Sequence, residues 1–429
     1  MSNSKKKLVE QFLDFEEKLN LFEDSKTEVI WPIVRIKLYG AIHAKYNNYT
    51  EAHPKSRMTT TVINIIKSLW LAIIKAPIFL SHKDTIIFNH SRRIENAKGY
   101  YECKYTEHLV NINSYVFEAP FYNRHLPPEN LQNLIYLDLL LNISRFYSLI
   151  KSKYLFNTRS ARATTYLTKQ IQKEFNIVIN PLFINLAVNK YSALLFFANI
   201  ILRKIKPSKI FMAVAYSDIN LPFVVSARSQ GIKVIEIQHG IMGMDHVAYN
   251  FKVKRNFYWF PDEVWVWNDF WREHSRFPIH ESKIIIKGFP FLDRFKKSRK
   301  STVCRKNIIC ISQGPYTSEL VGLCLSLNKL IDNTKFQILY RPHPSELAAG
   351  KAAFTSLTKE GIGISTTSNI YEEFSRSDIQ IGVNSTALFE GIEFGLTTFI
   401  LKLNGWEVFE KNRHVFCIEN AKEILIKLR

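Results

Sequence analysis

Several well-known active-site motifs are missing from this sequence of 429 residues. It contains no Gly-x-Gly-x-x-Gly fingerprint and no P-loop, which argues against dinucleotide oxidoreductases and P-loop nucleoside triphosphatases. It also lacks the Gly-x-Ser-x-Gly elbow that carries the nucleophile of α/β-hydrolases. No Asp-x-Asp pair occurs, so a metal-bridged sugar-nucleotide site is not supported. We therefore expect no metal site and no cofactor.

Cysteine is scarce, and no Cys-x-x-Cys pair is present. The five cysteines are Cys103, Cys304, Cys310, Cys324 and Cys417. Their odd number and wide spacing indicate buried or free thiols in a reducing compartment. Near the start, Lys5, Lys6 and Lys7 precede a charged, amphipathic stretch instead of a continuous apolar run, so no signal peptide is indicated. These features predict a cytoplasmic protein.

Acidic residues are outnumbered. Lys and Arg total 58 against 38 Asp and Glu, which gives a formal net charge of +20. An excess of this size favours an anionic partner: nucleic acid, an anionic membrane face or a phosphorylated substrate. Zinc-finger spacing, an RNP-like strand and basic-region heptads are all lacking, so we expect no nucleic-acid partner.

Residues 59–80 form an apolar stretch that is long enough to span a bilayer. Lys67 and Lys75 interrupt it, however, and a central lysine costs roughly 3 kcal/mol on membrane-insertion scales. The stretch therefore predicts an amphipathic helix, which either packs on the protein or lies on an anionic membrane surface. The second alternative would place the protein peripherally at the inner face of the cell membrane.

The first half of the chain predicts helices with two early strands. Helical spacing of apolar residues predicts helices over residues 5–22 and 28–46, and a long helical region over 131–204 that breaks near Pro181. Strands are predicted at residues 84–89 and 114–118, the first with the apolar character of a strand buried on both faces.

From residue 209 onward, apolar strands alternate with helices, which indicates a doubly wound parallel sheet. Before residue 294 the predicted strands are 210–215, 233–237, 263–267 and 283–287, with a helix at 221–230. After residue 306 the predicted strands are 307–311, 336–340, 363–365, 379–383, 398–401 and 415–418, and the predicted helices are 318–330, one after Ser345, 370–375, 386–394 and 421–428.

A basic, polar stretch over residues 294–306 separates the two series and predicts an interdomain linker. We therefore expect an α/β protein with an N-terminal Rossmann-like domain over residues 1–293, which includes a helical extension, and a C-terminal Rossmann-like domain over residues 305–429. Ligands of such sheets bind at the carboxyl ends of the strands. Candidate site residues are accordingly those that follow a predicted strand.

The strongest local motif is Arg341-Pro342-His343-Pro344, which follows a predicted strand. The two prolines fix their own φ angles and bias the preceding residues towards extended conformations. The resulting stiff loop presents an Arg and a His, both of which suit a phosphate oxygen. The competing interpretation is a loop in which both side chains only bond local carbonyl groups.

A second motif, Asn384-Ser385-Thr386, lies where a predicted strand turns into a helix. Asn384 or Ser385 can cap that helix, whose free amide groups and positive end favour an anion. Glu390 lies farther along the helix and can accept a hydrogen bond from a ribose hydroxyl. The alternative is simple capping with a structural glutamate.

Four other strand ends offer candidates. Ser312 and Gly314 follow the first strand of the C-terminal series, where Gly314 permits close approach of a ligand. His239, flanked by glycines, and Asp218 follow strands of the N-terminal series and are candidate bases, although structural roles compete for both. His90 is a rival base, as is Glu95.

Taken together, His343-Pro344, the later Ser385-Thr386 turn and the Gln238-His239-Gly240 segment resemble motifs of bacterial GT-B enzymes of surface-polysaccharide synthesis. The similar groups are capsule-polysaccharide transferases of the sialyl- and Kdo-transferring kind and the related CDP-glycerol glycerophosphotransferases. The resemblance covers the chain from about residue 209 to its end.

This resemblance implies a GT-B fold, in which two Rossmann-like domains face a cleft, here with extra N-terminal helices. It also implies a metal-independent, inverting glycosyltransferase whose C-terminal domain binds a nucleotide-sugar donor, CMP-linked by preference. The acceptor would be a glycan or lipid-linked glycan bound by the N-terminal domain. The alternatives are a CDP-glycerol- or ribitol-type polyol-phosphate transferase and a non-catalytic polysaccharide-assembly protein. The resemblance assigns His343, Pro344, Ser385 and Thr386 to the donor phosphates. With the strand-end residues above, the candidate donor-binding residues are Ser312, Gly314, Arg341, His343, Pro344, Asn384, Ser385, Thr386 and Glu390, and the candidate bases are His239 and Asp218.

Overall fold

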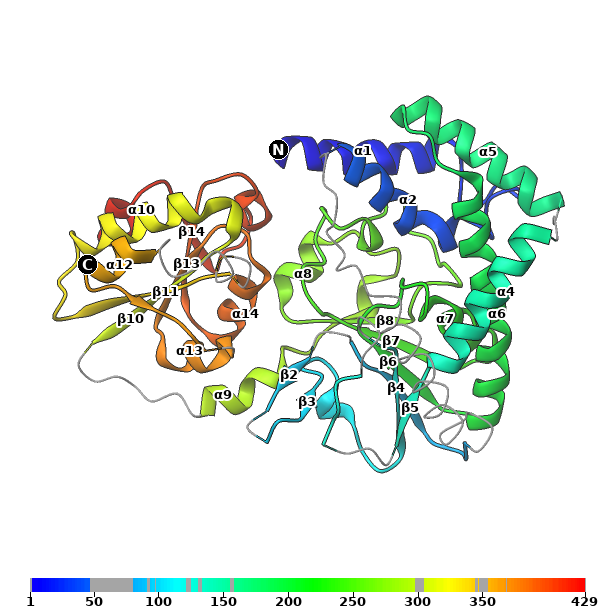
Figure 1. Cartoon of the computed structure of the whole chain (residues 1–429), viewed down its shortest axis with the longest axis horizontal. Helices are drawn as coiled ribbons and strands as arrows, with labels where there is room; N and C mark the ends of the chain where they lie inside the picture. Colours follow the sequence, from blue (N-terminus) through cyan, green and yellow to red (C-terminus); the bar gives the residue numbers. More distant parts are fainter. Residues whose placement is uncertain are drawn as a thin grey trace. The chain divides into compact units, whose positions relative to one another are not determined.

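A computed structural model describes residues 2–46, 80–90, 93–96, 98–120, 125–129, 133–154, 158–297, 305–343, 346, 354–367 and 369–428. The chain forms two compact units (Figure 1). The first is Lys5–Ile286, which we call the N-terminal unit, and the second is Lys287–Arg429 with Met1–Ser4, which we call the C-terminal unit. The predicted amphipathic helix at residues 59–80 lies outside the described residues, except for Leu80, and so does Pro344.

Parallel strands form the centre of the N-terminal unit. Among the described residues, seven of them pair in the order β5-β4-β1-β6-β7-β8-β9, and every pair is parallel. The strands are β1 (Thr85–Phe88), β4 (Ser114–Glu118), β5 (Leu134–Tyr136), β6 (Lys209–Met212), β7 (Lys233–Ile237), β8 (Glu263–Val266) and β9 (Ile284–Ile286).

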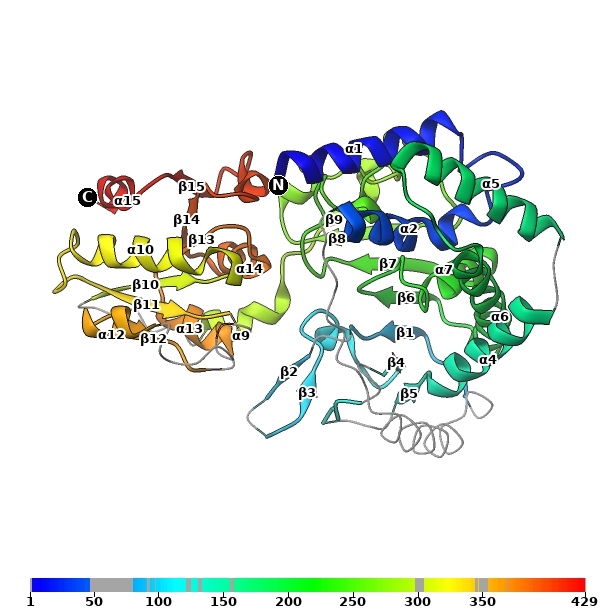
Figure 2. The ribbon, with the colours of Figure 1, turned by 45° about the horizontal axis from the view of Figure 1, so that its top comes forward.

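Helices surround this sheet, and the first two of them are additional to it at the N-terminus (Figure 2). They are α1 (Ser2–Lys18), α2 (Trp31–Tyr46), α4 (Asp138–Tyr154), α5 (Thr158–Phe175), α6 (Pro181–Ile205), α7 (Leu221–Ser229) and α8 (Asp269–His274). Alternate strand residues such as Ile86 and Phe88 share one buried cluster with residues of α4, α6 and α7, including Leu141, Leu194 and Phe223. These three helices therefore pack on the same face of the sheet.

The longest helix among the described residues, α6, has clear end signals in the sequence. Asn180 caps its start by accepting a hydrogen bond from the Leu182 amide, and Pro181 occupies the first turn, where a missing amide proton costs nothing. At the other end, Lys206 adopts a left-handed conformation and its amide bonds to the Leu202 carbonyl. The chain then enters β6 directly.

The C-terminal unit is a second doubly wound domain. Among its described residues, six parallel strands pair in the order β12-β11-β10-β13-β14-β15. The strands are β10 (Lys306–Ile311), β11 (Phe336–Arg341), β12 (Gly363–Ile364), β13 (Ile379–Gly382), β14 (Thr397–Leu401) and β15 (Val415–Ile418). The helices are α9 (Asp293–Lys297), α10 (Thr317–Asn328), α12 (Thr355–Lys359), α13 (Ile370–Arg376), α14 (Thr386–Phe394) and α15 (Ala421–Leu428).

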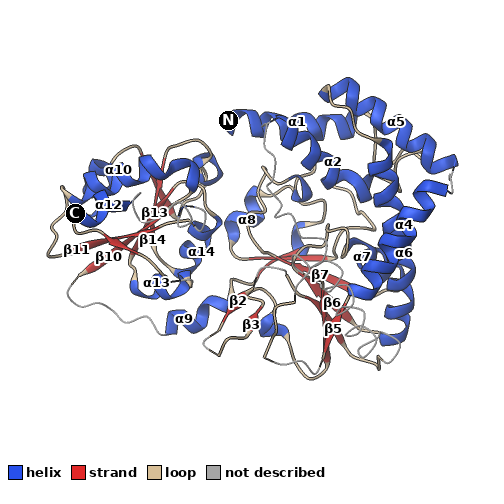
Figure 3. Cartoon of the chain, in the orientation of Figure 1, coloured by secondary structure: helices blue, strands red, loops and turns tan. Residues whose placement is uncertain are grey.

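The α/β class with two Rossmann-like domains and extra N-terminal helices is confirmed (Figure 3). The local structure differs from the prediction in three places. Leu134–Tyr136, predicted to be helical, forms the edge strand β5. A short antiparallel hairpin, β2 (Ile94–Glu95) and β3 (Tyr101–Glu102), was not predicted. In the predicted linker, Asp293–Lys297 forms α9, and the rings of Phe291 and Phe295 contact Tyr371 of the C-terminal unit in edge-on and tilted arrangements.

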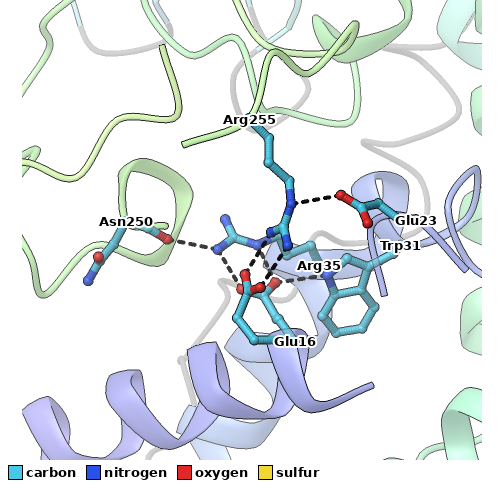
Figure 4. Close-up of polar contacts among 7 residues, drawn as sticks. Glu16, Glu23, Trp31, Arg35, Asn250 and Arg255 are labelled. Carbon is cyan, nitrogen blue, oxygen red and sulfur yellow. Dashed lines mark hydrogen bonds and ion pairs between the residues drawn. The ribbon is translucent and has the colours of Figure 1, made fainter. Parts of the chain in front are cut away.

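A buried arginine attaches the N-terminal helices to the rest of their unit (Figure 4). Arg35 of α2 pairs with Glu16 of α1 at 2.5 Å, and both side chains are almost fully buried. The same guanidinium group donates to the Val247 carbonyl at 2.6 Å and to the Asn250 carbonyl at 3.0 Å. These bonds fix the short 3₁₀ turn at Val247–Tyr249, which follows β7 in the chain.

Candidate functional site

The order in which strands are added to the C-terminal sheet reverses at β10. This strand has β11 on one side and β13 on the other, so the chain leaves β10 in one direction and later returns to its opposite side. A ligand of an open parallel sheet binds outside the carboxyl ends of the strands at such a switch point. The three predicted phosphate loops follow β10, β11 and β13. The fold therefore brings them to one edge of the sheet.

Glu346 ties two of these loops together, although sequence reasoning did not select it. Its carboxylate accepts a hydrogen bond from the Ser312 hydroxyl at 2.8 Å and one from the Thr317 hydroxyl. It also accepts from the His343 backbone amide. Tyr340 completes the network by donating to the Ser312 hydroxyl at 2.7 Å. Ser312, predicted to contact the donor, is thus engaged in positioning the loop after β11.

His343 and Arg341 take different positions. The His343 side chain is exposed at the end of β11, with its backbone fixed by Glu346. Arg341 is half-buried and donates to the Ser365 hydroxyl at 3.0 Å and to the Thr367 carbonyl at 2.9 Å. Burial lowers the pKa of Arg341. The contacts of Arg341 match the local role that the sequence left open, whereas the His343 side chain is exposed to solvent.

The turn after β13 leads into the N-terminus of α14, as the sequence predicts. Ser385 caps α14 by accepting from the Ala387 amide at 3.3 Å, and Thr386 is the first helical residue. The Asn384 amide donates to the Gln313 side chain at 3.0 Å, which joins this turn to the loop after β10. The first amide groups of a helix point outward and carry partial positive charge, so they favour an anion here.

Close packing fixes Asn384. Gly405 has φ of +95° and leaves room for the Asn384 amide, since a β-carbon on Gly405 would lie 2.0 Å from Asn384 Nδ2. The Asn404 carbonyl accepts from the Tyr316 hydroxyl and from Asn384 Nδ2. A backbone turn and an aromatic side chain therefore hold Asn384 in place.

Two other predicted donor residues are less suited to a ligand. Glu390 is buried, and its carboxylate accepts a hydrogen bond from the Tyr371 hydroxyl at 2.6 Å. Contact with a ribose would require exchange of that bond. Gly314 opens a short 3₁₀ turn, and its carbonyl accepts from the Thr317 hydroxyl at 3.0 Å. Its φ is not positive, so the turn itself does not require glycine.

The N-terminal sheet has its own switch point at β1, which lies between β4 and β6. Histidine and tyrosine rings gather at the carboxyl ends of these strands and of β7. His239 stacks on His90 with ring centroids 5.4 Å apart, and Tyr105 and Tyr216 lie at 6.3 and 6.4 Å from His239. His239 is half-buried in this aromatic surround. The fold thus brings together two of the candidate bases, His239 and His90.

A buried acid lies beneath this cluster. Glu236 of β7 is 1% exposed and accepts hydrogen bonds from the Tyr249 hydroxyl at 2.6 Å and the Ala215 amide at 3.1 Å. Burial raises the pKa of Glu236 to about 7, although both hydrogen bonds favour the ionised form. A small cavity beside it is lined by residues including Arg35, Ala215, Tyr216, Trp259 and Phe260.

Gln238 positions the turn that carries His239. Its side-chain amide donates to the Gly240 carbonyl at 2.8 Å, and its carbonyl oxygen accepts from the Trp267 amide at 2.8 Å. The side chain is fully buried. A buried glutamine that bonds both sides of a turn leaves that turn little freedom, so His239 is held relative to β7 and β8.

Asp218 is paired with cations. Its carboxylate bonds Lys190 of α6 at 2.6 Å and Lys37 of α2 at 3.3 Å. Burial opposes its ionisation, but the two ammonium groups outweigh this effect and lower the pKa of Asp218 to about 2. A carboxylate held this strongly in its charged form is a poor proton acceptor. The geometry favours a role in joining α2 to α6.

In the part of the chain that the structure describes, no group of three or more His, Cys, Asp or Glu side chains could hold a metal ion. The four cysteines in that part, Cys103, Cys310, Cys324 and Cys417, have free thiols.

Neither a scan against protein-family models nor a search of curated proteins finds a match. A search of solved structures finds similarities at low identity. UDP-GlcNAc 2-epimerase from Methanocaldococcus jannaschii is 12% identical, with 80% of this chain and 90% of that chain covered and a TM-score of 0.45.

The wall teichoic acid polymerase TagF is also 12% identical, with coverage of 87% and 88% and a TM-score of 0.40. MurG from Acinetobacter baumannii is 14% identical, with coverage of 56% and 69% and a TM-score of 0.36. The assignment to the α/β class stands on the two parallel sheets described above.

Proposed function

We propose that the protein is a metal-independent glycosyltransferase that uses a nucleotide-activated sugar, with a CMP-linked donor preferred. The observation that carries this proposal is the carboxyl edge of β10, β11 and β13, where an exposed His343 and the N-terminus of α14 converge. Two such donors at a switch point suit the phosphate of a nucleotide.

In this proposal the donor phosphate binds to His343, to Thr386 and to the first amide groups of α14, while Ser385 caps the helix. These groups stabilise the negative charge that develops on the phosphate as its bond to the sugar breaks. Glu346 and Gln313 act as positioning residues, since they hold the two loops by hydrogen bonds. Hydrogen bonds thereby replace the metal that other transferases use.

The acceptor, a surface glycan or a lipid-linked glycan, is proposed to bind the N-terminal unit. His239 is the proposed base, because its turn is held by Gln238 and its ring lies among aromatic side chains that can stack on a sugar. It takes the proton of the acceptor hydroxyl as that oxygen attacks the anomeric carbon. The bond to the donor phosphate breaks at the same time, so the configuration inverts and the nucleotide leaves with the electron pair.

The proposed location is the cytoplasmic face of the cell membrane, where lipid-linked acceptors are available. Its support is the net charge of +20, which favours an anionic surface.

Thermal shift with nucleotides tests the donor site. A ligand at 100 times its Kd stabilises a protein by about 2.7 kcal/mol. We expect CMP or CDP to raise the Tm of the C-terminal unit, and His343→Ala to weaken binding by roughly 10- to 100-fold, the value of a charged hydrogen bond. His414→Ala is the matched control, because His414 is also exposed but precedes β15 at the opposite edge of the sheet. Unchanged binding in His343→Ala would refute the site.

The same screen separates the rivals. Preferential stabilisation by CDP-glycerol or CDP-ribitol over nucleotide sugars would identify a polyol-phosphate transferase. A complete lack of nucleotide binding would favour a non-catalytic assembly protein. Transfer is then measured as nucleotide release from the bound donor, which His239→Ala should abolish while leaving donor binding unchanged.

A further inference from the structure

Two neighbouring helices of the N-terminal unit expose apolar side chains to solvent. On α4 the outward positions include Ile143, Phe146, Tyr147 and Ile150, which recur at helical spacing, and Leu149 lies beside them. Phe146 is 66% exposed. Its helix buries the opposite side through Leu140 and Leu141, which belong to the core of the sheet.

Helix α6 likewise has one apolar side that is exposed and one that is buried. Phe196 is 61% exposed and Ile200 is 50% exposed, one turn apart, while Leu194, Ala198 and Ile201 face the core. Hydrogen bonds from the Ser148 hydroxyl to the Leu186 carbonyl and between Asn189 and Ser152 join the two helices. Figures 1 and 2 show them side by side. Both helices cover the same face of the sheet, and we call their outward stripes together the α4–α6 face.

In the described chain, α6 is the one helix long and apolar enough to cross a membrane, and 28% of its most apolar stretch is buried in the unit. Its buried side packs against the sheet, and its last residue leads through Lys206 into β6. A helix attached in this way cannot leave its domain to span a bilayer. It can lie along a surface with its outward stripe in the lipid.

The charges of the α4–α6 face indicate whether its binding partner is a bilayer or a second copy of the chain. Asp138 is the single acidic residue in the sequences of α4 and α6, and it is buried and bonded to His125. Exposed basic residues lie along the two helices and include Arg145, Arg203 and Lys204. Such a surface attracts anionic lipid. It would repel another copy of a chain that carries a net charge of +20.

We infer that the α4–α6 face docks on an anionic phospholipid bilayer. Phe146, Leu149, Phe196 and Ile200 enter the acyl boundary, and the neighbouring basic side chains contact the lipid head groups. This docking is independent of residues 59–80, and it holds the N-terminal unit at the membrane whether or not that unit binds a lipid-linked acceptor.

Vesicle sedimentation of the full-length chain without any nucleotide tests this inference. We expect binding to vesicles of phosphatidylcholine with phosphatidylglycerol and much weaker binding to phosphatidylcholine alone. Combined Phe146→Ser and Phe196→Ser substitutions should weaken binding by about tenfold or more for each side chain removed from lipid. Arg203→Gln should weaken binding to the anionic vesicles by about fivefold, the effect of one basic residue near such a surface.

Val29→Ser with Ile426→Ser is the matched control, since these side chains are 54% and 67% exposed on other elements. Both double variants should keep the Tm of the parent chain, because neither removes a core residue. Unchanged vesicle binding after loss of Phe146 and Phe196 would overturn the inference and assign any binding to another segment. A dimer in gel filtration that these two substitutions dissociate, with no vesicle binding, would also overturn it. Since no donor is present, neither result bears on the proposed transferase activity.

Discussion

Glu236 couples the stability of the N-terminal unit to pH. Its pKa in the folded chain is raised to about 7 from the usual 4.5 by burial. A carboxyl with a raised pKa stabilises the fold fully below its unfolded pKa, and this stabilisation is lost as the pH rises towards 7. The shift corresponds to an order of 3 kcal/mol between pH 4.5 and pH 8. The parent chain should therefore lose stability across this range.

Urea denaturation of the parent and of Glu236→Gln at pH 5, 6, 7 and 8 measures this effect. The glutamine carbonyl can accept the same bonds from Tyr249 and Ala215 but does not ionise. The variant should lack the decline that Glu236 contributes between pH 5 and 7. If both proteins show the same pH dependence, Glu236 does not titrate in this range.

Single residues also show which candidate positions a sequence can indicate. His239, His343 and Ser385 were selectable because each directly follows an apolar strand, and parallel strands end at the same edge of a sheet. Glu346 and Glu236 could not be selected from the sequence, because folding alone brings their partners next to them. Ser312 is 34 residues away from Glu346 in the chain, and Tyr249 is 13 residues away from Glu236. A carboxyl in a sequence does not reveal whether it will be buried.

At the scale of elements, the contact between α14 and β13 sets the position of the proposed phosphate site. Gly391 of α14 lies directly over Gln380 of β13, and a β-carbon there would come within 2.1 Å of the Gln380 side chain. Gln380 has no room to yield, since it is buried and donates to the Leu388 carbonyl and the Thr398 hydroxyl. The helix would have to move away from the sheet.

Gly391→Ala should therefore destabilise the C-terminal unit by about 1–3 kcal/mol, the usual cost of overpacking, and should weaken nucleotide binding. Gly322→Ala is the matched control on α10, because its β-carbon would meet nothing within 4 Å. There the substitution should stabilise the helix by about 0.5–1 kcal/mol. Thermal melts with and without CMP compare the two variants. Equal changes in Tm and in stabilisation by CMP would show that the close contact of α14 with β13 is not needed for stability or nucleotide binding.

Elements also show why some boundaries escaped prediction. Strand β5 has three residues next to the start of α4, so its apolar residues continue the helical pattern. The strands of the β2–β3 hairpin have two residues each, too few for any period to appear. The long strands and helices of the C-terminal unit carried enough apolar positions to be predicted in order.

At the scale of the whole molecule, each unit has its own core. The C-terminal cluster joins β10, β11, β13 and β14 to α10 and α15, and its members all lie between Ile308 and Leu428. A unit with a closed core of this kind can fold alone. The sequence predicts that the C-terminal domain begins at residue 305, whereas the compact unit already includes the chain from Lys287 onward.

Contacts of the segment before β10 favour the earlier start. Phe291 is buried and lies 5.1 Å from the Tyr371 ring, and Phe295 lies 5.4 Å from it. Arg294 covers Phe291 at 4.0 Å. Tyr371 in turn donates to Glu390 of α14. Removal of residues 287–304 would expose Tyr371 and leave this buried bond open to water.

We expect a fragment of residues 287–429 to unfold cooperatively and to bind CMP or CDP with the affinity of the full chain, because the phosphate loops all lie within it. A fragment of residues 305–429 should be less stable by about 3–5 kcal/mol, the cost of removing a buried aromatic side chain. Urea denaturation and nucleotide thermal shifts of the two fragments make the comparison. Equal stability would place the domain boundary at residue 305 and reduce α9 to a linker. If the longer fragment folds without binding nucleotide, the donor site needs groups from the N-terminal unit as well.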